Sequence, residues 1–598
     1  MEAIESIIEN IKNSKSFVLE AGAGAGKTYA LIQTINHLIE SRGDDLLLKN
    51  QRIVCITYTN VAKNEIIERL ENNPLILVST IHEFLWDCIK SFNKQLLVEF
   101  DNMNTSYHEE KPEKFTLGLI NRIKRVEYTD KAFSEFEQGI VGHDDLIILA
   151  KRLFENYNLL SSIFASKYPY VLVDEYQDTA PETIHTLLDS ILAKNKNNIT
   201  IGFYGDSHQK IYNTGVGSLS TYVENNTIEL VKKIENYRSS SNVIKLLNKI
   251  RTNIQQIIPD GIEKIDGEVK FINFTNYPSK TSGQKVKEYE DSLIPQKNIN
   301  YDNTIKELEN EGWDFTAGSE DKILIVANSR VARRGGFGNL YALYSKRFGQ
   351  SANEALLKRE NPITTLFLGS EDKKTSKERK TGIEHLVDFY LNLQYSEVVN
   401  FLKKNGLNSV NLKKHIDKKL ITDKLDQLIK LRENKTIGEV LEFAIDNKLI
   451  VPSLGVTKFL DRINSNFENL DDKQRKRAEI DKTFFEALLT LPYLEVIHCF
   501  KHTQNQNVFS TKHGTKGEEY RNVLVVIDDT SWKGQYNFES YFDNSDDNID
   551  RKERTKNLFY VSCSRAKEKL VVLALSKMGD NAMKTIRNWF SIDNIIEY

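Results

Sequence analysis

A glycine-rich segment near the start of the chain has the residue types that bind phosphate groups. Residues 21–28 read Ala-Gly-Ala-Gly-Ala-Gly-Lys-Thr, between an apolar run at residues 17–20 and an amphipathic stretch with helical spacing. Small residues let backbone N–H groups approach phosphate oxygens, and the start of a helix adds a favourable dipole. In this pattern Lys27 reaches the terminal phosphates and the Thr28 hydroxyl ligates Mg²⁺. The candidate binding residues are Ala21, Gly22, Ala23, Gly24, Ala25, Gly26, Lys27 and Thr28.

Two carboxylates follow a second apolar run. Residues 170–173 read as a buried strand, and Asp174 and Glu175 come directly after it. Ligands of open α/β sheets bind at the carboxyl ends of the strands. There Asp174 would hold Mg²⁺ through water, and Glu175 would act as the general base on an attacking water. The plainer alternative is an acidic turn, but a phosphate loop on the same predicted sheet favours nucleotide hydrolysis.

The remaining apolar runs predict the elements that position these residues. Short β-branched runs alternate with helical patterns, which is typical of βαβ units and parallel sheets. Two stretches, from about residue 88 to 165 and from about 336 to 505, look mainly helical and interrupt this alternation. The predicted strands are residues 17–20, 52–57, 75–79, 170–173, 199–204, 269–274, 322–326, 522–527 and 570–575.

Composition excludes several classes of protein. The chain has 598 residues, of which 40% are hydrophobic, and its formal net charge is −3. No bulk positive field exists, so any nucleic acid must bind in a local groove. Four cysteines without a CxxC spacing argue against a disulfide framework or a zinc site. Apolar runs stay far below the ~20 residues of a membrane span, so we expect a cytoplasmic protein without a membrane partner.

Several further motifs, in a fixed order, resemble those of superfamily-one DNA helicases of the UvrD/Rep type. The resemblance extends from residue 21 to residue 571 and includes the phosphate loop and the Asp-Glu pair. The other matching segments are residues 56–62 (Ile-Thr-Tyr-Thr-Asn-Val-Ala), 79–84 (Ser-Thr-Ile-His-Glu-Phe), 143–146 (His-Asp-Asp-Leu), 202–212, 234–239, 510–520 and 560–566.

The resemblance implies roles for residues around ATP. Gln209 would sense the γ-phosphate, Tyr237 would stack on adenine, and Arg238 would touch the γ-phosphate. Glu519 would bind the ribose. Arg565 would serve as an arginine finger that reaches the nucleotide from the second sheet, a contact worth several powers of ten in rate in related sites.

The resemblance also implies contacts to DNA. For Tyr58, His82 and His513 the alternative is ordinary packing, and we interpret Asp144 and Asp145 as helix caps rather than functional groups. The implied nucleic-acid-binding residues are Tyr58, Asn60, Thr80, His82, Thr511 and His513.

The implied fold is α/β, with two RecA-like parallel-sheet motor domains of the P-loop NTPase class, each carrying a mainly helical insertion. The first domain would comprise residues 1–88 and 165–245, with its insertion at residues 89–164. The second would comprise residues 246–335 and 506–598, with its insertion at residues 336–505.

Some positions depart from the family pattern. Residues 1–16 contain no Gln for the usual adenine-recognition motif, and Tyr29, which can itself stack on a base, stands where the family typically has Arg. Residues 213–217 read Asn-Thr-Gly-Val-Gly where the family has Gly-Trp-Arg-Gly, so the Trp that stacks on a DNA base is missing. These departures therefore weaken the prediction of processive unwinding more than the prediction of ATP hydrolysis.

The leading interpretation is an ATP-dependent 3′–5′ DNA helicase or single-stranded DNA translocase that uses ATP and Mg²⁺ on single-stranded or tailed duplex DNA. A first alternative is a nucleic-acid-sensing ATPase subunit that regulates a separate nuclease, as in Gabija-type antiphage systems. A second alternative is an RNA helicase, which binding to matched DNA and RNA strands would distinguish. DNA repair, plasmid maintenance and antiviral defence all use such motors.

Overall fold

The chain forms two compact units in a computed structural model. The first unit comprises Met1–Phe271, Lys533–Val571 and Met578–Ile596, and the second comprises Ile272–Trp532, Val572–Lys577 and Glu597–Tyr598. Each unit therefore combines segments that are distant in the sequence. The structure describes residues 2–129, 134–210, 214–316, 318–325, 328–371, 378–405, 415–465, 472–504, 509–510, 518–529 and 534–598.

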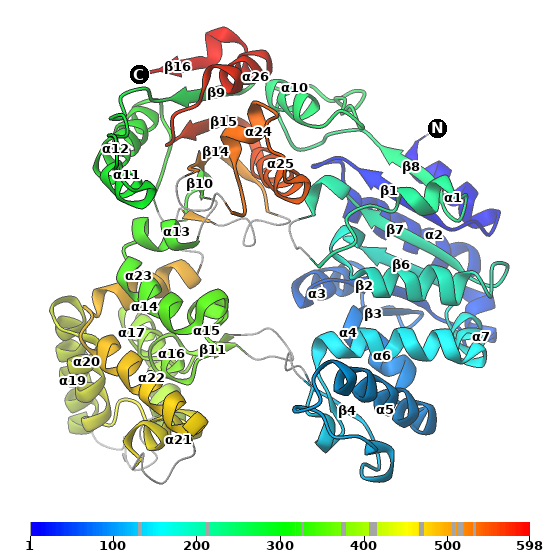
Figure 1. Ribbon diagram of the computed structural model, residues 1–598, viewed down its shortest axis with the longest axis horizontal. Helices are drawn as coiled ribbons and strands as arrows, with labels where there is room; N and C mark the ends of the chain where they lie inside the picture. The colour runs from blue at the N-terminus through cyan, green and yellow to red at the C-terminus, as the bar shows by residue number, and fades with distance from the viewer. Residues whose placement is uncertain are drawn as a thin grey trace. The chain divides into compact units, whose positions relative to one another are not determined.

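The first unit contains a six-stranded sheet with the order β3-β2-β6-β7-β1-β8 (Figure 1). All neighbouring strands in it are parallel, so their carboxyl ends share one edge. Every residue of β1, β2 and β7 is buried, which explains their uninterrupted apolar runs. The strands are β1 (Phe17–Ala21), β2 (Ile53–Thr57), β3 (Ile76–Thr80), β6 (Tyr170–Asp174), β7 (Thr200–Gly205) and β8 (Glu229–Lys233).

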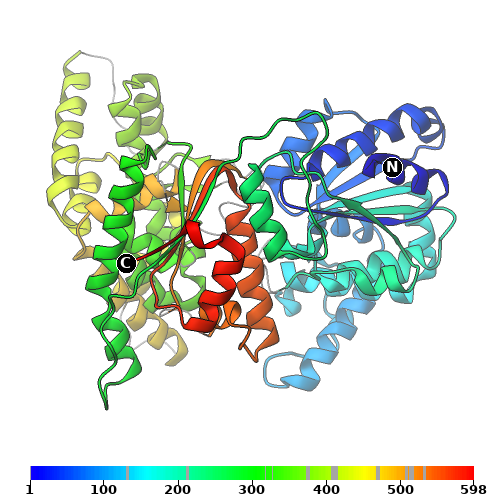
Figure 2. The same cartoon turned by 90° about the horizontal axis from the view of Figure 1, so that it is seen from above.

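Helices cover both faces of this sheet. On one face, Leu19, Cys55 and Leu172 pack with α1, α2 and α3 in one hydrophobic core. On the other face, Val54 and Val173 pack with a second set of helices, and Figure 2 shows the strands between these two layers. The first layer consists of α1 (Ala3–Lys12), α2 (Lys27–Leu48) and α3 (Asn60–Arg69). The second consists of α4 (Ile81–Ile89), α5 (Asn93–Glu110), α6 (His143–Asn156), α7 (Asn158–Lys167), α8 (Pro181–His185) and the π-helix η4 (Thr186–Leu192).

Further helices complete the first unit. The apolar face of α10 (Ser241–Ile250) is buried, and this helix packs against α25 (Ile549–Cys563). Ser239, just before α10, donates from Oγ to the carbonyl of Ala566 over 2.9 Å. Residues near 240 and near 560 are thereby held together. Other elements are β4 (Glu127–Tyr128), β5 (Ile140–Val141), α9 (Ser220–Glu224), α24 (Phe538–Phe542) and α26 (Asp580–Phe590).

A second six-stranded sheet has the order β13-β10-β14-β15-β9-β16. Within it β10 pairs in parallel with both β13 and β14. From Asn522 to Ile527, β14 is buried, as its apolar sequence predicts. The strands are β9 (Glu268–Asn273), β10 (Lys322–Ile325), β13 (Phe509–Ser510), β14 (Tyr520–Ile527), β15 (Ala566–Ala574) and β16 (Ile595–Glu597).

The second unit contains a helical block with its own hydrophobic core. Two helices, α11 (Val286–Ser292) and α12 (Ile294–Asn310), and a small hairpin of β11 (Ser370–Glu371) and β12 (Glu378–Arg379) lie outside this core. The block consists of α13 (Asn328–Arg334), α14 (Gly338–Phe348), α15 (Ala352–Leu356), α16 (Pro362–Leu368), α17 (Ile383–Leu391), α18 (Tyr395–Asn405), α19 (His415–Asn434), α20 (Ile437–Asp446), α21 (Leu454–Asn464), α22 (Asp472–Leu489) and α23 (Leu494–Thr503).

The predicted parallel α/β class is confirmed, and each apolar run predicted as a strand overlaps an observed strand. The edge strand β8 was not predicted, because three of its five residues are charged rather than apolar. Among the described residues, no helix combines the length and apolar character that a membrane crossing requires.

Candidate nucleotide-binding site

The predicted phosphate loop joins β1 to α2 at the carboxyl edge of the first sheet. Gly24 and Gly26 have φ values of +73° and +76°, a conformation that favours glycine. A Cβ on Gly24 would lie 2.7 Å from Cβ of Arg238. A Cβ on Gly22 would overlap the amide of Gln256, at 2.2 Å from Nε2. The glycines therefore serve both the turn and close packing against residues 236–256.

Side chains from other segments hold the loop backbone in place. Asn236 Nδ2 and Gln256 Nε2 both donate to the carbonyl of Ala23, over 3.2 and 2.8 Å. The N–H of Ala23 donates to Oη of Tyr560 over 3.1 Å. All three partner side chains are buried. The loop is thus fixed by groups more than 200 residues away in the sequence.

The loop lysine faces the predicted general base. Nζ of Lys27, the first residue of α2, lies 3.4 Å from Oε2 of Glu175. Their side chains are 12% and 23% exposed, so a ligand can reach both. Asp174 ends β6 and is buried, and its Oδ1 accepts from the N–H of Glu175 over 3.0 Å. Thr28 is half-buried beside Lys27 at the start of α2.

Glu175 is oriented by its own backbone and by Gln177. Its φ of +50° is rare for a residue with a side chain, and strained backbone of this kind clusters at functional sites. Gln177 Nε2 donates to Glu175 Oε2, and Gln177 Oε1 accepts from the N–H of Asp206 over 3.1 Å. Asp206 Oδ2 accepts from Gln209 Nε2 over 2.8 Å. A continuous set of hydrogen bonds thus connects the predicted base with Gln209.

The two predicted arginines lie close to these groups. Arg565 is buried, and its Nη2 donates to Oε1 of Gln209 over 3.0 Å. Arg238 Nη1 donates to the carbonyl of Ser564, the residue before Arg565, over 3.0 Å. Guanidinium groups in this position can stabilise negative charge that develops on a phosphoryl group. The structure therefore brings Lys27, Glu175, Gln209, Arg238 and Arg565 into one region of the first unit.

Two exposed tyrosines border the loop. Tyr29 is 64% exposed and Tyr237 is 49% exposed. A Cβ on Gly26 would lie 3.8 Å from Cβ of Tyr29 and 4.0 Å from Cε of Lys233. Lys233 Nζ in turn lies 5.4 Å from the ring centroid of Tyr237. Exposed aromatic faces at the loop suit stacking on a nucleobase.

The residues implied as DNA contacts have more varied surroundings. Tyr58 is 38% exposed just after β2, and Asn60 is the first residue of α3. Thr80 forms a capping box at the start of α4 together with Glu83, which gives it a structural role. Glu519 is exposed, directly before β14 in the second unit. Thr511 and His513 lie outside the described residues.

The ring of His82 packs against a second histidine. Its ring stacks on that of His143, with centroids 3.3 Å apart and planes 19° apart. Burial and the neighbouring His143 lower the pKa of His82 to about 3, so its imidazole is neutral. Asp145 accepts from Tyr107 over 2.7 Å and from Ser134, which agrees with a structural role in the first turn of α6.

Sequence reasoning missed a buried charged cluster behind the loop, formed by Glu20, Asp206 and Arg251. Glu20 and Asp206, together with His208, offer ligand atoms within 4.8 Å of one another, a spacing suited to a metal ion. Arg251 donates to both carboxylates, so a guanidinium already supplies the positive charge. The only local signal was a glutamate inside the apolar strand β1.

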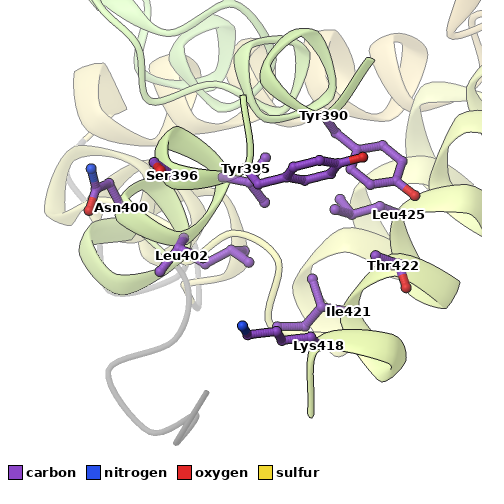
Figure 3. Close-up of a pocket in the computed structure, with 11 residues that line it drawn as sticks. Tyr390, Tyr395, Ser396, Asn400, Leu402, Lys418, Ile421, Thr422 and Leu425 are labelled. Carbon is purple, nitrogen blue, oxygen red and sulfur yellow. The ribbon is translucent and has the colours of Figure 1, made fainter. Parts of the chain in front are cut away.

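The helical block contains an apolar pocket of about 600 Å³ between α17, α18 and α19 (Figure 3). Tyr390 and Tyr395 line it together with aliphatic residues, and Oη of Tyr390 donates to Asp426 over 2.8 Å. Lys418 and Thr422 also line it, but no glycine is among its lining residues, in contrast to the loop.

Comparison with known proteins gives related sequences. Residues 4–215 match the family described as an AAA domain. The chain is 27% identical to Gabija protein GajB of Bacillus cereus, over 97% of this chain and 96% of that protein. It is 24% identical to a probable DNA helicase II homolog of Mycoplasma capricolum, over 92% and 81% of the two chains.

It is also 25% identical to the ATP-dependent DNA helicase PcrA of Staphylococcus aureus, over 47% of this chain and 42% of that protein. The AAA match covers the phosphate loop and the Asp-Glu pair. These relatives confirm that the chain resembles DNA helicases of the UvrD/Rep type and also the Gabija protein GajB.

Proposed function

We propose that this chain is an ATP-dependent DNA helicase or single-stranded DNA translocase that moves 3′ to 5′. The observation that carries the proposal is the 3.4 Å approach of Lys27 and Glu175 at the carboxyl edge of a parallel sheet. A cation for the terminal phosphates and a carboxylate for the attacking water are what triphosphate hydrolysis requires. Relatives named as DNA helicases support nucleic acid as the second ligand.

The site fits ATP and Mg²⁺ by its chemistry. Backbone N–H groups at the start of α2, after the positive-φ Gly24 and Gly26, suit phosphate oxygens. Thr28 and Asp174 offer the oxygen ligands that Mg²⁺ prefers. A bound Mg²⁺ would neutralise charge on the phosphates.

In this proposal each side chain has a defined task. Glu175 accepts a proton from the attacking water, while Lys27 binds the terminal phosphates. Gln209 and the linked Arg565 respond to the γ-phosphate and stabilise its transition-state charge, with Arg238 as a further contact. Outside the phosphate region, the rings of Tyr29 and Tyr237 stack on the base, and Glu519 binds the ribose.

The proposal includes two RecA-like motor domains, with the boundaries and helical insertions that the sequence resemblance implies. Hydrolysis would change how tightly each domain holds DNA, and alternate gripping would move the chain along one strand. Tyr58, Asn60, Thr80, His82, Thr511 and His513 are the proposed DNA contacts.

A second candidate is a nucleic-acid-sensing ATPase that regulates a partner nuclease in antiviral defence. Two observations favour it. The Trp-containing motif of the family is replaced at residues 213–217, and the similarity to Gabija protein GajB covers 97% of the chain. In this case ATP hydrolysis would act as a switch rather than as a motor.

ATP hydrolysis by the purified chain, with and without single-stranded DNA, tests the proposal. Strong stimulation by DNA, absent from the Lys27→Ala variant, is the expected result, and strand displacement on 3′-tailed duplexes follows as the second assay. Turnover that DNA does not change would contradict an autonomous motor. It would favour the partner-controlled ATPase.

A further inference from the structure

Arg251 occupies an unusual position directly after α10. Its side chain is 1% exposed, and it is among the largest fully buried side chains in the described chain. Nη2 donates to Glu20 Oε1 over 2.8 Å, and Nη1 donates to Asp206 Oδ1 over 2.7 Å. Burying three charges costs several kcal/mol per ion unless each is well paired and hydrogen-bonded. The elements that supply these charges are therefore held in one arrangement.

Glu20 connects Arg251 with the end of β6. Its Oε1 accepts from the N–H and Oγ of Ser207 over 2.9 and 2.6 Å, and its Oε2 accepts from Oη of Tyr176. Tyr176 directly follows Glu175, the proposed general base. The ring of Tyr176 thus anchors the turn whose positive φ orients Glu175.

Asp206 connects Arg251 with the proposed γ-phosphate sensor. One carboxylate oxygen accepts from Arg251 and from the N–H of His208, and the other accepts from Gln209, which itself bonds Arg565. Arg251 also contacts the Tyr560 hydroxyl at 3.5 Å, the same hydroxyl that accepts from the loop.

We propose that Arg251 is a positioning residue for ATP hydrolysis. Its pairing with Glu20 and Asp206 holds Gln209 and Arg565 in a fixed position relative to the phosphate loop. The proposal rests on the ATPase activity proposed above. Arg251 touches neither the loop lysine nor the general base, so it acts through the groups that it orients. Its loss should therefore lower turnover and leave nucleotide affinity almost unchanged.

Substitutions at Arg251 separate positioning from stability. Arg251→Lys keeps the positive charge but cannot span two carboxylates with a rigid fork. Because displacements of about 1 Å in a catalytic site lower rates ~10²-fold, we expect a kcat lower by one to two powers of ten. The KM for ATP and the affinity for a fluorescent ATP analogue should stay within about threefold, since the binding groups remain in place.

Arg251→Met removes the guanidinium altogether and leaves two buried carboxylates unpaired, which can prevent folding. A triple variant keeps the test valid in that case. Glu20→Gln, Asp206→Asn and Arg251→Met together remove every charge of the cluster, so no buried charge is left without its partner. The matched control is Arg432→Met in the helical block. Arg432 is also buried and pairs with Glu384 through two hydrogen bonds, so its loss should lower stability without lowering the kcat of folded protein.

The outcomes distinguish this inference from the proposed function. A wild-type chain that hydrolyses no ATP, with or without DNA, would remove the proposed function and the inference with it. If the wild-type chain is active and both Arg251→Lys and the triple variant have the wild-type kcat, the positioning role alone is overturned. Equal losses in kcat and in nucleotide affinity would also overturn it, because the role would then be in binding.

Discussion

At the scale of single residues, the site residues that could be predicted are those that lie in short sequence motifs. Lys27, Asp174 and Glu175 each belong to a short segment whose strand and loop context could be recognised from the sequence. Arg251 could not be found in this way, because its partner Glu20 is 231 residues away and neither residue lies in a motif with its partner. Long-range pairing of buried charges depends on the fold, which no local pattern encodes.

The role of Glu175 gives a direct prediction. Glu175→Gln removes the proposed general base but keeps side-chain volume and a hydrogen-bonding oxygen near Lys27. We expect ATP binding to persist while kcat falls by ~10²–10⁴-fold, the usual contribution of a general base. Single-turnover hydrolysis and analogue binding measure the two quantities, with the exposed Glu224→Gln as control. Full turnover in Glu175→Gln would assign the base to another residue.

At the scale of elements, strands with uninterrupted apolar runs were predictable, whereas the edge strand β8 was not. Tyr170–Val173 and Ile199–Tyr204 read as strands because their residues are apolar on both sides of the chain. The edge strand β8 has a mixed sequence, and its strand conformation depends on pairing with β1. The π-helix η4 likewise has no sequence signal that separates it from an α-helix.

Packing between strands β1 and β7 gives a prediction at this scale. Gly202 lies opposite Phe17, and a Cβ there would lie 2.5 Å from Cζ of the Phe17 ring and 3.0 Å from Leu172. Gly202→Ala should therefore lower the free energy of unfolding by about 1–3 kcal/mol through overpacking.

Thermal and urea unfolding measure this effect. Gly534→Ala is the matched control, because a Cβ there meets no atom within 4 Å and should leave stability unchanged. An unchanged midpoint for Gly202→Ala would mean that the Phe17 ring can move aside without loss.

At the scale of the whole molecule, each unit is formed by three separate stretches of the sequence. Apolar patterning indicated mainly helical stretches within the α/β pattern, and the described residues of those stretches are mainly helical, with the short strands β4, β5, β11 and β12 among them. It gave no indication that residues 533–571 would join a unit formed mainly by residues 1–271. That partition results from contacts such as those of Tyr560 and Arg565, which become visible only in three dimensions.

Buried histidines in both units predict how stability responds to pH. Burial is the main cause that lowers the pKa of His82 to about 3 and the pKa values of His208 and His502 to about 4. Because the unfolded histidines titrate near 6.5, the unfolded state binds more protons below that pH. Stability should thus be complete above about pH 7 and fall on acidification, by up to about 1.4 kcal/mol per pH unit for each histidine.

Urea unfolding between pH 7.5 and 5 measures this dependence, in a range where most carboxylates stay ionised. His82→Phe should reduce the slope for the first unit, and His502→Phe should do so for the second. Stability that does not change between pH 7 and 5 would contradict neutral burial of these side chains.

The contact between Ala23 and Tyr560 has a consequence for the synthesis of the protein. The two residues are 537 positions apart, so a ribosome working at 5–20 residues per second needs roughly 30–100 s to pass from one to the other. During that interval the nascent chain carries a phosphate loop without the hydroxyl that holds its backbone. A chain whose translation stops midway would therefore have a proposed ATP site that lacks one of the contacts fixing its phosphate loop.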